Sequence, residues 1–253
     1  MMRTVWIAAV IGLSVILSSL TPLTADTVWS VDTTRKQVAF TFDDGPKPES
    51  SIPLIDMLEK LQVRATFFVV GHEAQANIDL IKRLHEQGHE IANHTYNHRR
   101  LPALSDEEIL SELERTNAVI RSATGESPRL FRPPGGQFNT KVIQIAASLG
   151  LTVVLWDVNA GDYVLDVHRF PVKDESRRED GSSFSQSVIA KITTQAKPGS
   201  IILMHNGGDV IELLPTIVTK LRNRGFEIVT VGELLREGKP RPNSIWNNDH
   251  VPD

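Results

Sequence analysis

The apolar run VAFTF (Val38–Phe42) leads directly into Asp43-Asp44-Gly45-Pro46. Its β-branched and aromatic side chains are typical of a buried strand, and Asp, Gly and Pro together are typical of a turn. A helical stretch near residues 53–61 follows. This succession of strand, turn and helix is the first unit of the pattern that decides the fold.

Strands and helices continue to alternate along the chain. The clearest helix opens with a capping box at Ser105 and Glu108 and places Ile109, Leu113 and Ile120 on one face. The other expected strands are 64–70, 90–93, 130–131, 152–158, 200–204 and 226–231, and the other helices are 78–87, 140–149, 215–225 and 233–236. Such alternation predicts an α/β fold with a parallel sheet, open or closed into a barrel.

Composition excludes several classes of function. The chain has 253 residues, of which 40% are hydrophobic, and a formal net charge of −4. Because it has neither a basic field nor aromatic residues interleaved with basic ones, we do not expect nucleic-acid binding. The absence of cysteine rules out disulfides, thiolate metal sites and Cys nucleophiles, and it leaves 8 histidines as candidate ligands or acid–base groups.

Both ends of the chain and one internal segment fall outside the alternating pattern. Residues 1–25 combine Arg3, a short apolar run and the small-residue site Leu23-Thr24-Ala25, as in an export signal; an uncleaved membrane anchor is the alternative. We expect a lead-in at 26–37, the main domain at 38–236, a charged insert loop at 165–185, and a flexible tail at 237–253.

Polar clusters lie just past the ends of the predicted strands. They are Asp43-Asp44, His94, Arg132, Asp157 to Asp162, and His205. In a βα barrel these strand ends open onto one rim, where active sites are built. We therefore expect clusters that are far apart in the sequence to meet in one cleft.

A metal site is one interpretation of the first two clusters. His94 and His98 are spaced i, i+4, which would place both imidazoles on one face of a helical turn. With a carboxylate they form a two-His, one-Asp set that leaves positions open for water and substrate. Of Asp43 and Asp44, one could bind the metal while the other takes a proton. The alternatives are a histidine pair on a helix surface and a plain turn.

His205 and Arg132 are candidates for proton transfer and for orientation. His205 follows the apolar strand at 200–204, and Arg132 stands between Phe131 and two prolines. A histidine with an ordinary pKa near about 6.5 is suited to donate a proton to a leaving group; a hydrogen-bonded core histidine is the alternative. Arg132 could orient a carboxylate or form a structural ion pair, and the two roles are compatible.

Five motifs now stand in order along the chain: Thr41–Pro46 (TFDDGP), His94–His98 (HTYNH), Arg132–Gly136 (RPPGG), Trp156–Tyr163 and Leu203–His205 (LMH). In this order they resemble the motifs of the polysaccharide deacetylase (NodB-homology) carbohydrate esterases. The resemblance covers about residues 38–235 and implies a distorted (β/α)7 barrel in a single catalytic domain. Its details are closest to exported bacterial members that act on cell-wall glycans.

The resemblance implies a metal site and a base. Asp44, His94 and His98 would bind a divalent metal, usually zinc, with cobalt, nickel or manganese as alternatives. Asp43 would be the general base that deprotonates the metal-activated water.

Further roles follow from the same resemblance. Arg132 would orient the base, and His205 would be the general acid. Asp162 would either pair with Arg132 or tune His205. The residues expected to contact substrate are Leu203, Gly135 and Tyr163.

The implied activity is hydrolytic removal of N-acetyl groups from an N-acetylhexosamine polysaccharide, with peptidoglycan first and chitin-type oligomers second. The acetylated glycan is the expected partner of a monomer that is secreted or associated with the cell wall and meets a membrane only through an uncleaved N-terminal segment. The chain departs from the family pattern at Gly135, Asn159, Tyr163 and Asn206 and in the insert. These departures bear on the identity of the substrate more than on activity.

Two other functions compete with this one. A catalytically silent glycan-binding module would keep the fold and the metal, and the departures motivate it. A non-haem Fe(II) oxygenase would also use two histidines and a carboxylate, but it does not account for the TFDDGP motif.

Overall fold

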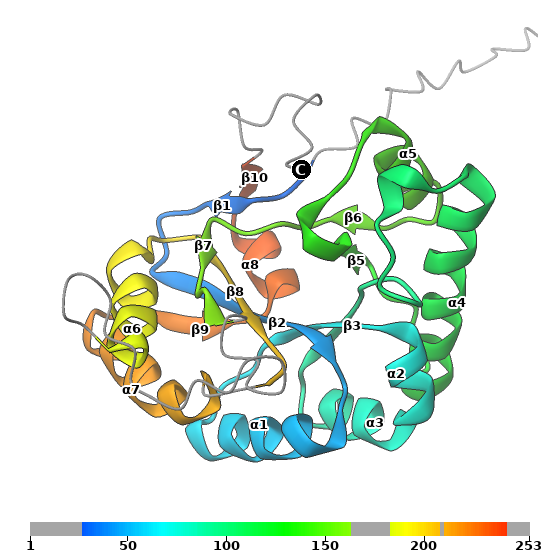
Figure 1. Ribbon diagram of the computed structural model, residues 1–253. Coiled ribbons are helices and arrows are strands. Elements are labelled where there is room, and N and C mark those ends of the chain that lie inside the picture. Colours follow the sequence, from blue (N-terminus) through cyan, green and yellow to red (C-terminus); the bar gives the residue numbers. More distant parts are fainter. Residues whose placement is uncertain (1–26, 163–182, 208–209, 242–253) are drawn as a thin grey trace, which may run out of the picture.

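The computed structural model describes residues 27–162, 183–207 and 210–241, and a curled parallel sheet forms its centre (Figure 1). Its strands are β2 (Gln37–Gly45), β3 (Thr66–Val69), β4 (Glu90–Asn93), β5 (Leu130–Phe131), β6 (Thr152–Val153), β7 (Val158–Asn159), β8 (Ile201–His205) and β9 (Glu227–Val229). They lie in the order β6-β5-β4-β3-β2-β8-β7, and β9 pairs with the start of β2. All these pairings are parallel, so the carboxyl ends of the strands all lie at the same end of the sheet.

Most helices pack around the outside of the sheet (Figure 1); the last one shares a buried cluster, through Val231 and Leu234, with Ala39 and Phe68 on the other face of the sheet. The helices are α1 (Pro48–Leu61), α2 (Gly71–Ala76), α3 (Ile78–Glu86), α4 (Asp106–Thr124), α5 (Thr140–Ser148), α6 (Phe184–Gln195), α7 (Val210–Asn223) and α8 (Val231–Glu237). Their apolar faces fill the layer against the strands; Leu54 and Ile55 of α1, for example, share a fully buried cluster with Phe40 and Phe42 of β2. Burial of both faces explains why the strands are apolar throughout.

The predicted α/β barrel architecture is confirmed in an open form. Within the described residues, β6 and β7 are the two edges of the sheet. The stretch 152–158, predicted as one strand, is two short strands on opposite edges, joined by residues 154–157. Apart from Asp157 its side chains are apolar or β-branched, and a buried connection and a buried strand can have the same composition, so the break was not predicted.

Predicted helices are correct in position, and two of them begin earlier than expected. The Ser105–Glu108 capping box is present at the start of α4. Helix α1 begins at Pro48, not near Pro53, and α7 begins at Val210, not near Pro215. A proline has no N–H to pair with the carbonyl four residues earlier, so it leaves one carbonyl of the helix unpaired. Pro53 and Pro215 are accommodated inside these helices in this way and do not mark their first residues.

Several short elements were not predicted. Helix α6 begins at the end of the expected insert loop, where Ser183 and Gln186 form a capping box. Helix α2 and two three-residue strands, β1 (Ser30–Asp32) and β10 (Lys239–Arg241), were also missed. β1 and β10 pair antiparallel, so the predicted tail begins with an ordered strand. Such short strands depend on a distant partner and give almost no local signal.

The remaining segments of the predicted organisation lie outside the described residues. These are the N-terminal signal or anchor at 1–25, residues 165–182 of the insert, and residues 242–253 of the tail. In the parts of the chain that the structure describes, no helix is both long and apolar enough to cross a bilayer.

Candidate metal and catalytic site

Two acids leave the carboxyl end of β2 in different directions. Asp43 is 4% exposed and pairs in register with His205 of the neighbouring strand β8. At Asp44 the backbone turns to a φ of 71°, and the register with β3 shifts between Asp43 and Gly45. The turn at Asp44 separates the two carboxylates, so that each meets a different set of partners.

His94 and His98 come from the loop that follows β4, not from a helical turn as predicted. Thr95 and His98 have φ values of 66° and 54°, which are incompatible with a right-handed helix. The loop nevertheless brings the two rings together, with centroids 5.1 Å apart. The i, i+4 spacing correctly predicted a convergent pair, but through a different backbone geometry.

Asp44 and the two imidazoles converge on one point. Asp44 Oδ1 lies 3.1 Å from His98 Nε2 and 3.4 Å from His94 Nε2. One ligand atom from each of the three residues lies within 4.8 Å of the others. Asp44 Oδ1 is buried, and none of the residues that the structure describes gives it a hydrogen bond. A buried carboxylate oxygen without a partner is costly unless something else binds it, so the donor set fits a divalent cation.

The environment also sets the protonation of these ligands. Burial acts to raise the pKa of Asp44, but the neighbouring imidazoles of His94 and His98 outweigh it and hold that pKa well below its usual range. His94 Nδ1 lies 2.7 Å from the carbonyl oxygen of Arg132. A carbonyl oxygen only accepts, so this contact places a ring proton on Nδ1 and leaves Nε2 as the atom that would bind a metal.

Arg132 orients Asp43 through a hydrogen bond. Its guanidinium is fully buried and donates to Asp43 Oδ1 at 2.7 Å, to Thr41 Oγ1 at 2.8 Å, and to backbone carbonyls. Its Cζ also lies 4.0 Å from the centroid of the Phe68 ring. Four hydrogen bonds and this stacking fix the guanidinium, which in turn fixes one oxygen of Asp43.

Asp162 contacts His205 and not Arg132. Its carboxylate accepts a hydrogen bond from the backbone N–H of His205 at 2.7 Å and lies 3.0 Å from His205 Nδ1. Burial favours neutral His205, but Asp162, Asp43 and Asp44 outweigh this effect and raise its pKa to about 9. Of the two predicted partners of Asp162, the structure therefore selects the histidine.

Asp157 does not join this cluster. Its carboxylate accepts hydrogen bonds from Ser200 Oγ at 2.9 Å and from the backbone N–H of Ile201 at 2.8 Å, at the start of β8. Asp157 thus stabilises the opposite end of the strand that carries His205.

The residues expected to contact substrate are placed as follows. Leu203 is almost fully buried in β8. Gly135 has a φ of 62° and lines a cavity together with Trp29, Trp156 and Lys191. A Cβ atom at Gly135 would meet only Gln137 Cγ at 4.0 Å, so there is open space at this position. Tyr163 lies outside the described residues.

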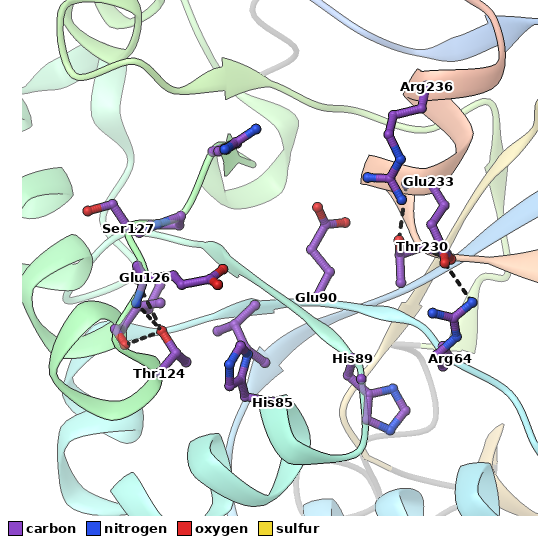
Figure 2. A pocket seen from close by; sticks show the side chains of 15 residues that line it. Arg64, His85, His89, Glu90, Thr124, Glu126, Ser127, Thr230, Glu233 and Arg236 are labelled. Atoms are coloured by element: carbon purple, nitrogen blue, oxygen red, sulfur yellow. Dashed lines mark hydrogen bonds and ion pairs between the residues drawn. The ribbon is translucent and has the colours of Figure 1, made fainter.

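A second pocket lies at the amino ends of β3, β4 and β5 (Figure 2). Its lining includes His85, His89 and Glu90, none of which the sequence marked as functional. Glu90 Oε2 accepts hydrogen bonds from Thr66 Oγ1 at 2.8 Å and Gly232 N at 2.9 Å, and His89 Nδ1 accepts one from Ala65 N at 3.1 Å. Glu90 and His89 therefore accept hydrogen bonds from backbone N–H groups and from Thr66.

One charged residue near the site escaped the sequence analysis. Glu112, in the middle of α4, is 4% exposed and accepts hydrogen bonds from the loop between His94 and His98. Its position three residues after Ile109, on the face of the helix that carries Ile109 and Leu113, was the available signal. The packing of α4 against the loop shows what it binds.

Comparison with known proteins supports the resemblance. The family model described as polysaccharide deacetylase matches residues 30–154. A peptidoglycan-N-acetylglucosamine deacetylase of Bacillus cereus is 34% identical over 212 residues, covering 82% of this chain and 92% of that protein. The peptidoglycan-N-acetylmuramic acid deacetylase PdaC of Bacillus subtilis is 31% identical over 216 residues, covering 84% of this chain but only 41% of that longer protein.

Solved structures extend the comparison. A peptidoglycan N-acetylglucosamine deacetylase aligns with a TM-score of 0.73 at 28% identity, over 85% of this chain and 95% of that one. A CE4 family pseudoenzyme from Bacillus anthracis aligns with a TM-score of 0.74 at 28% identity, over 85% of this chain and 70% of that one. Identity and coverage together show that the chain belongs to the polysaccharide deacetylase family, CE4.

Proposed function

We propose that this protein is a metal-dependent hydrolase that removes N-acetyl groups from peptidoglycan. The observation that carries the proposal is the unpartnered, buried Oδ1 of Asp44, placed between His94 Nε2 and His98 Nε2. Next to it Asp43 is held by Arg132, and His205 is held by Asp162. Groups that could bind a cation, accept a proton and donate a proton therefore lie together at the carboxyl end of the strands.

Asp44, His94 and His98 would hold the metal. Two imidazoles and one carboxylate are a common ligand set for zinc and leave positions open. A divalent cation there would polarise the acetyl carbonyl and lower the pKa of water. The native metal is proposed as zinc, with cobalt, nickel or manganese as alternatives.

Asp43 would act as the base and His205 as the acid. Arg132 binds Oδ1 of Asp43, while Oδ2 lies 3.7 Å from His94 Nε2, on the side of the proposed cation. Asp43 is thus oriented to take a proton from attacking water. His205, whose pKa is about 9, carries a proton at neutral pH and can give it to the departing sugar amine.

Relatives guide the choice of substrate. Those quoted above are named as deacetylases of peptidoglycan N-acetylglucosamine or N-acetylmuramic acid. The cavity beside Gly135, lined by Trp29 and Trp156, offers aromatic surface on which a sugar ring could stack. We therefore place peptidoglycan before chitin-type oligomers, and we place the protein outside the cytoplasm, where this substrate lies.

A catalytically silent glycan-binding module is the second candidate. The similarity to a structure described as a CE4 family pseudoenzyme favours it, because it shows that the fold alone does not imply catalysis. Because a silent module would also keep the metal ligands, what argues against it for this chain is Asp43 held by Arg132 and His205 held by Asp162.

The test is acetate release. Purified protein is treated with a chelator, reconstituted with zinc, and incubated with peptidoglycan and with N-acetylglucosamine oligomers. Mass spectrometry then follows the exchange of an acetyl group for hydrogen. Release that requires zinc supports the hydrolase. Glycan binding without release for any substrate or metal would instead establish the silent module.

A further inference from the structure

The loop that carries His94 and His98 has a backbone that needs external support. Thr95 and His98, with φ values of 66° and 54°, both adopt the left-handed conformation. Each non-glycine residue in this conformation costs free energy relative to ordinary backbone. The contact of His94 with the Arg132 carbonyl fixes only the start of the loop. Other contacts must hold the turn at Tyr96 and Asn97.

Glu112 of α4 supplies these contacts. Its Oε2 accepts hydrogen bonds from the backbone N–H of Tyr96 at 2.9 Å and of Asn97 at 2.7 Å. Its Oε1 accepts one from Asn97 Nδ2 at 2.7 Å. Hydrogen bonds to an ionised acceptor are the stronger class. Both oxygens of this buried carboxylate are thus used on the turn between the two histidines.

The start of α2 holds the same turn from its other side. Gly71 N donates to Thr95 O at 2.9 Å, and His72 N donates to Tyr96 O at 3.0 Å. A Cβ atom at Gly71 would lie 2.6 Å from both Thr116 Oγ1 and Tyr96 Cδ2, so a glycine is required for this close approach. The loop is clamped between α2, which binds its carbonyl groups, and α4, which binds its N–H groups through Glu112.

We propose that Glu112 is a positioning residue that presets the His94–His98 pair for metal binding. It touches neither imidazole and acts only on the backbone between them. Without its carboxylate the turn would lose three hydrogen bonds, and the two Nε2 atoms would no longer be held beside Asp44 before a metal arrives. The inference rests on the proposed metal site and concerns its affinity, not the chemical step.

The test is zinc affinity in Glu112→Gln. Glutamine keeps the size of the side chain and one oxygen that can still accept from Tyr96 N and Asn97 N, but it removes the charge and places an amide NH₂ against Asn97 Nδ2, which is itself a donor. We expect zinc to bind about 10–100-fold more weakly, the usual effect of losing support behind metal ligands. Competition with a chromophoric chelator measures the dissociation constant without substrate. Circular dichroism and thermal unfolding of the metal-free protein verify the fold.

Two control variants separate positioning from charge and from stability. Glu114→Gln removes the same charge from an exposed site on α4. Ile120→Val trims a buried side chain of α4 away from the loop. Both are expected to bind zinc within about twofold of wild type, even though Ile120→Val lowers the unfolding temperature. If folded Glu112→Gln binds zinc as tightly as these controls, the proposal is overturned.

A milder variant covers the case in which Glu112→Gln does not fold. Asn97→Ala removes only the bond from Asn97 Nδ2 to Glu112. We expect its zinc affinity to fall by about tenfold, the effect of one hydrogen bond to a charged group, and an unchanged affinity would refute the proposal. Because no measurement here uses a substrate, failure of the deacetylase assay and failure of this inference are distinguishable.

Discussion

The two ends of the parallel strands carry similar side chains in opposite states. At the carboxyl end, Asp44 Oδ1 is buried without a hydrogen bond and faces two imidazoles. At the amino end, in the pocket of Figure 2, Glu90 and His89 have their hydrogen bonds satisfied by the backbone and Thr66.

The pKa shifts of the buried groups also differ between the two ends of the strands. At the amino end burial dominates: it raises the pKa of Glu90 and, together with Arg64, lowers that of His89 to about 4. At the carboxyl end burial is outweighed by opposite charges, so the pKa of Asp44 is low and that of His205 is about 9. A histidine or carboxylate in a pocket therefore indicates a functional site where a buried nitrogen or oxygen atom is left without a hydrogen bond from the protein.

The largest expected effect comes from Asp43→Asn at the carboxyl end. The substitution keeps the size of the side chain but removes the base, which should lower kcat by about 10²–10⁴. Zinc should still bind, because Asp44, His94 and His98 are unchanged. Initial rates of acetate release and zinc titration of the same samples test this. An Asp43→Asn enzyme with wild-type kcat would exclude Asp43 as the base.

An intermediate effect is expected from Asp162→Asn. An acid catalyst must be protonated, so activity falls as pH rises through the pKa of His205, which is about 9 in the presence of Asp162. Loss of the Asp162 charge should move this alkaline limb to lower pH by about 1–3 units, the usual contribution of one nearby opposite charge. The pH dependence of kcat/KM measures the shift. An unmoved alkaline limb would mean that His205 is not the acid or that Asp162 does not tune it.

The smallest effect is expected from Glu90→Gln at the amino end. A glutamine oxygen can accept the same two hydrogen bonds, so kcat/KM should stay within about twofold of wild type. Because burial raises the pKa of Glu90, its ionised form costs folding free energy as pH rises above that pKa. The variant should thus be at least as stable as wild type at pH 7, with a smaller difference near pH 4.

Thermal unfolding at the two pH values, together with the acetate assay, measures both properties of Glu90→Gln. A large loss of activity without loss of stability would contradict the contrast between the two ends, since it would give the amino-end pocket a part in catalysis.

Some features were accessible from the sequence because their physical cause is local. The capping box of α4 involves residues three apart and was predicted correctly. The alternation of apolar strands and helices gave the parallel architecture. It also put the polar clusters at one edge, since parallel strands share their direction. Asp157 was the exception, because the break in the stretch 152–158 placed it beside the start of β8.

Other features depend on contacts between distant segments. The sequence left Asp162 with two possible partners, and the choice of His205 depends on how β7 lies beside β8. The backbone of the histidine loop is set by α2 and α4, so its spacing alone suggested a helix that does not form. Glu112 lies on the helix face of Ile109 and Leu113, but only the contact with the histidine loop shows what it binds.

The sequence by itself determined which chemical groups are available and the edge of the sheet at which most of them meet, because strand direction and side-chain type are fixed along the chain. Only the tertiary structure decided which groups are left without partners. Glu90 Oε2 accepts hydrogen bonds from a backbone N–H and Thr66, whereas Asp44 Oδ1 receives no hydrogen bond from the described residues and faces the two imidazoles that would share a metal with it. Hydrogen-bond satisfaction depends on atoms brought together from distant segments, and no local pattern records it.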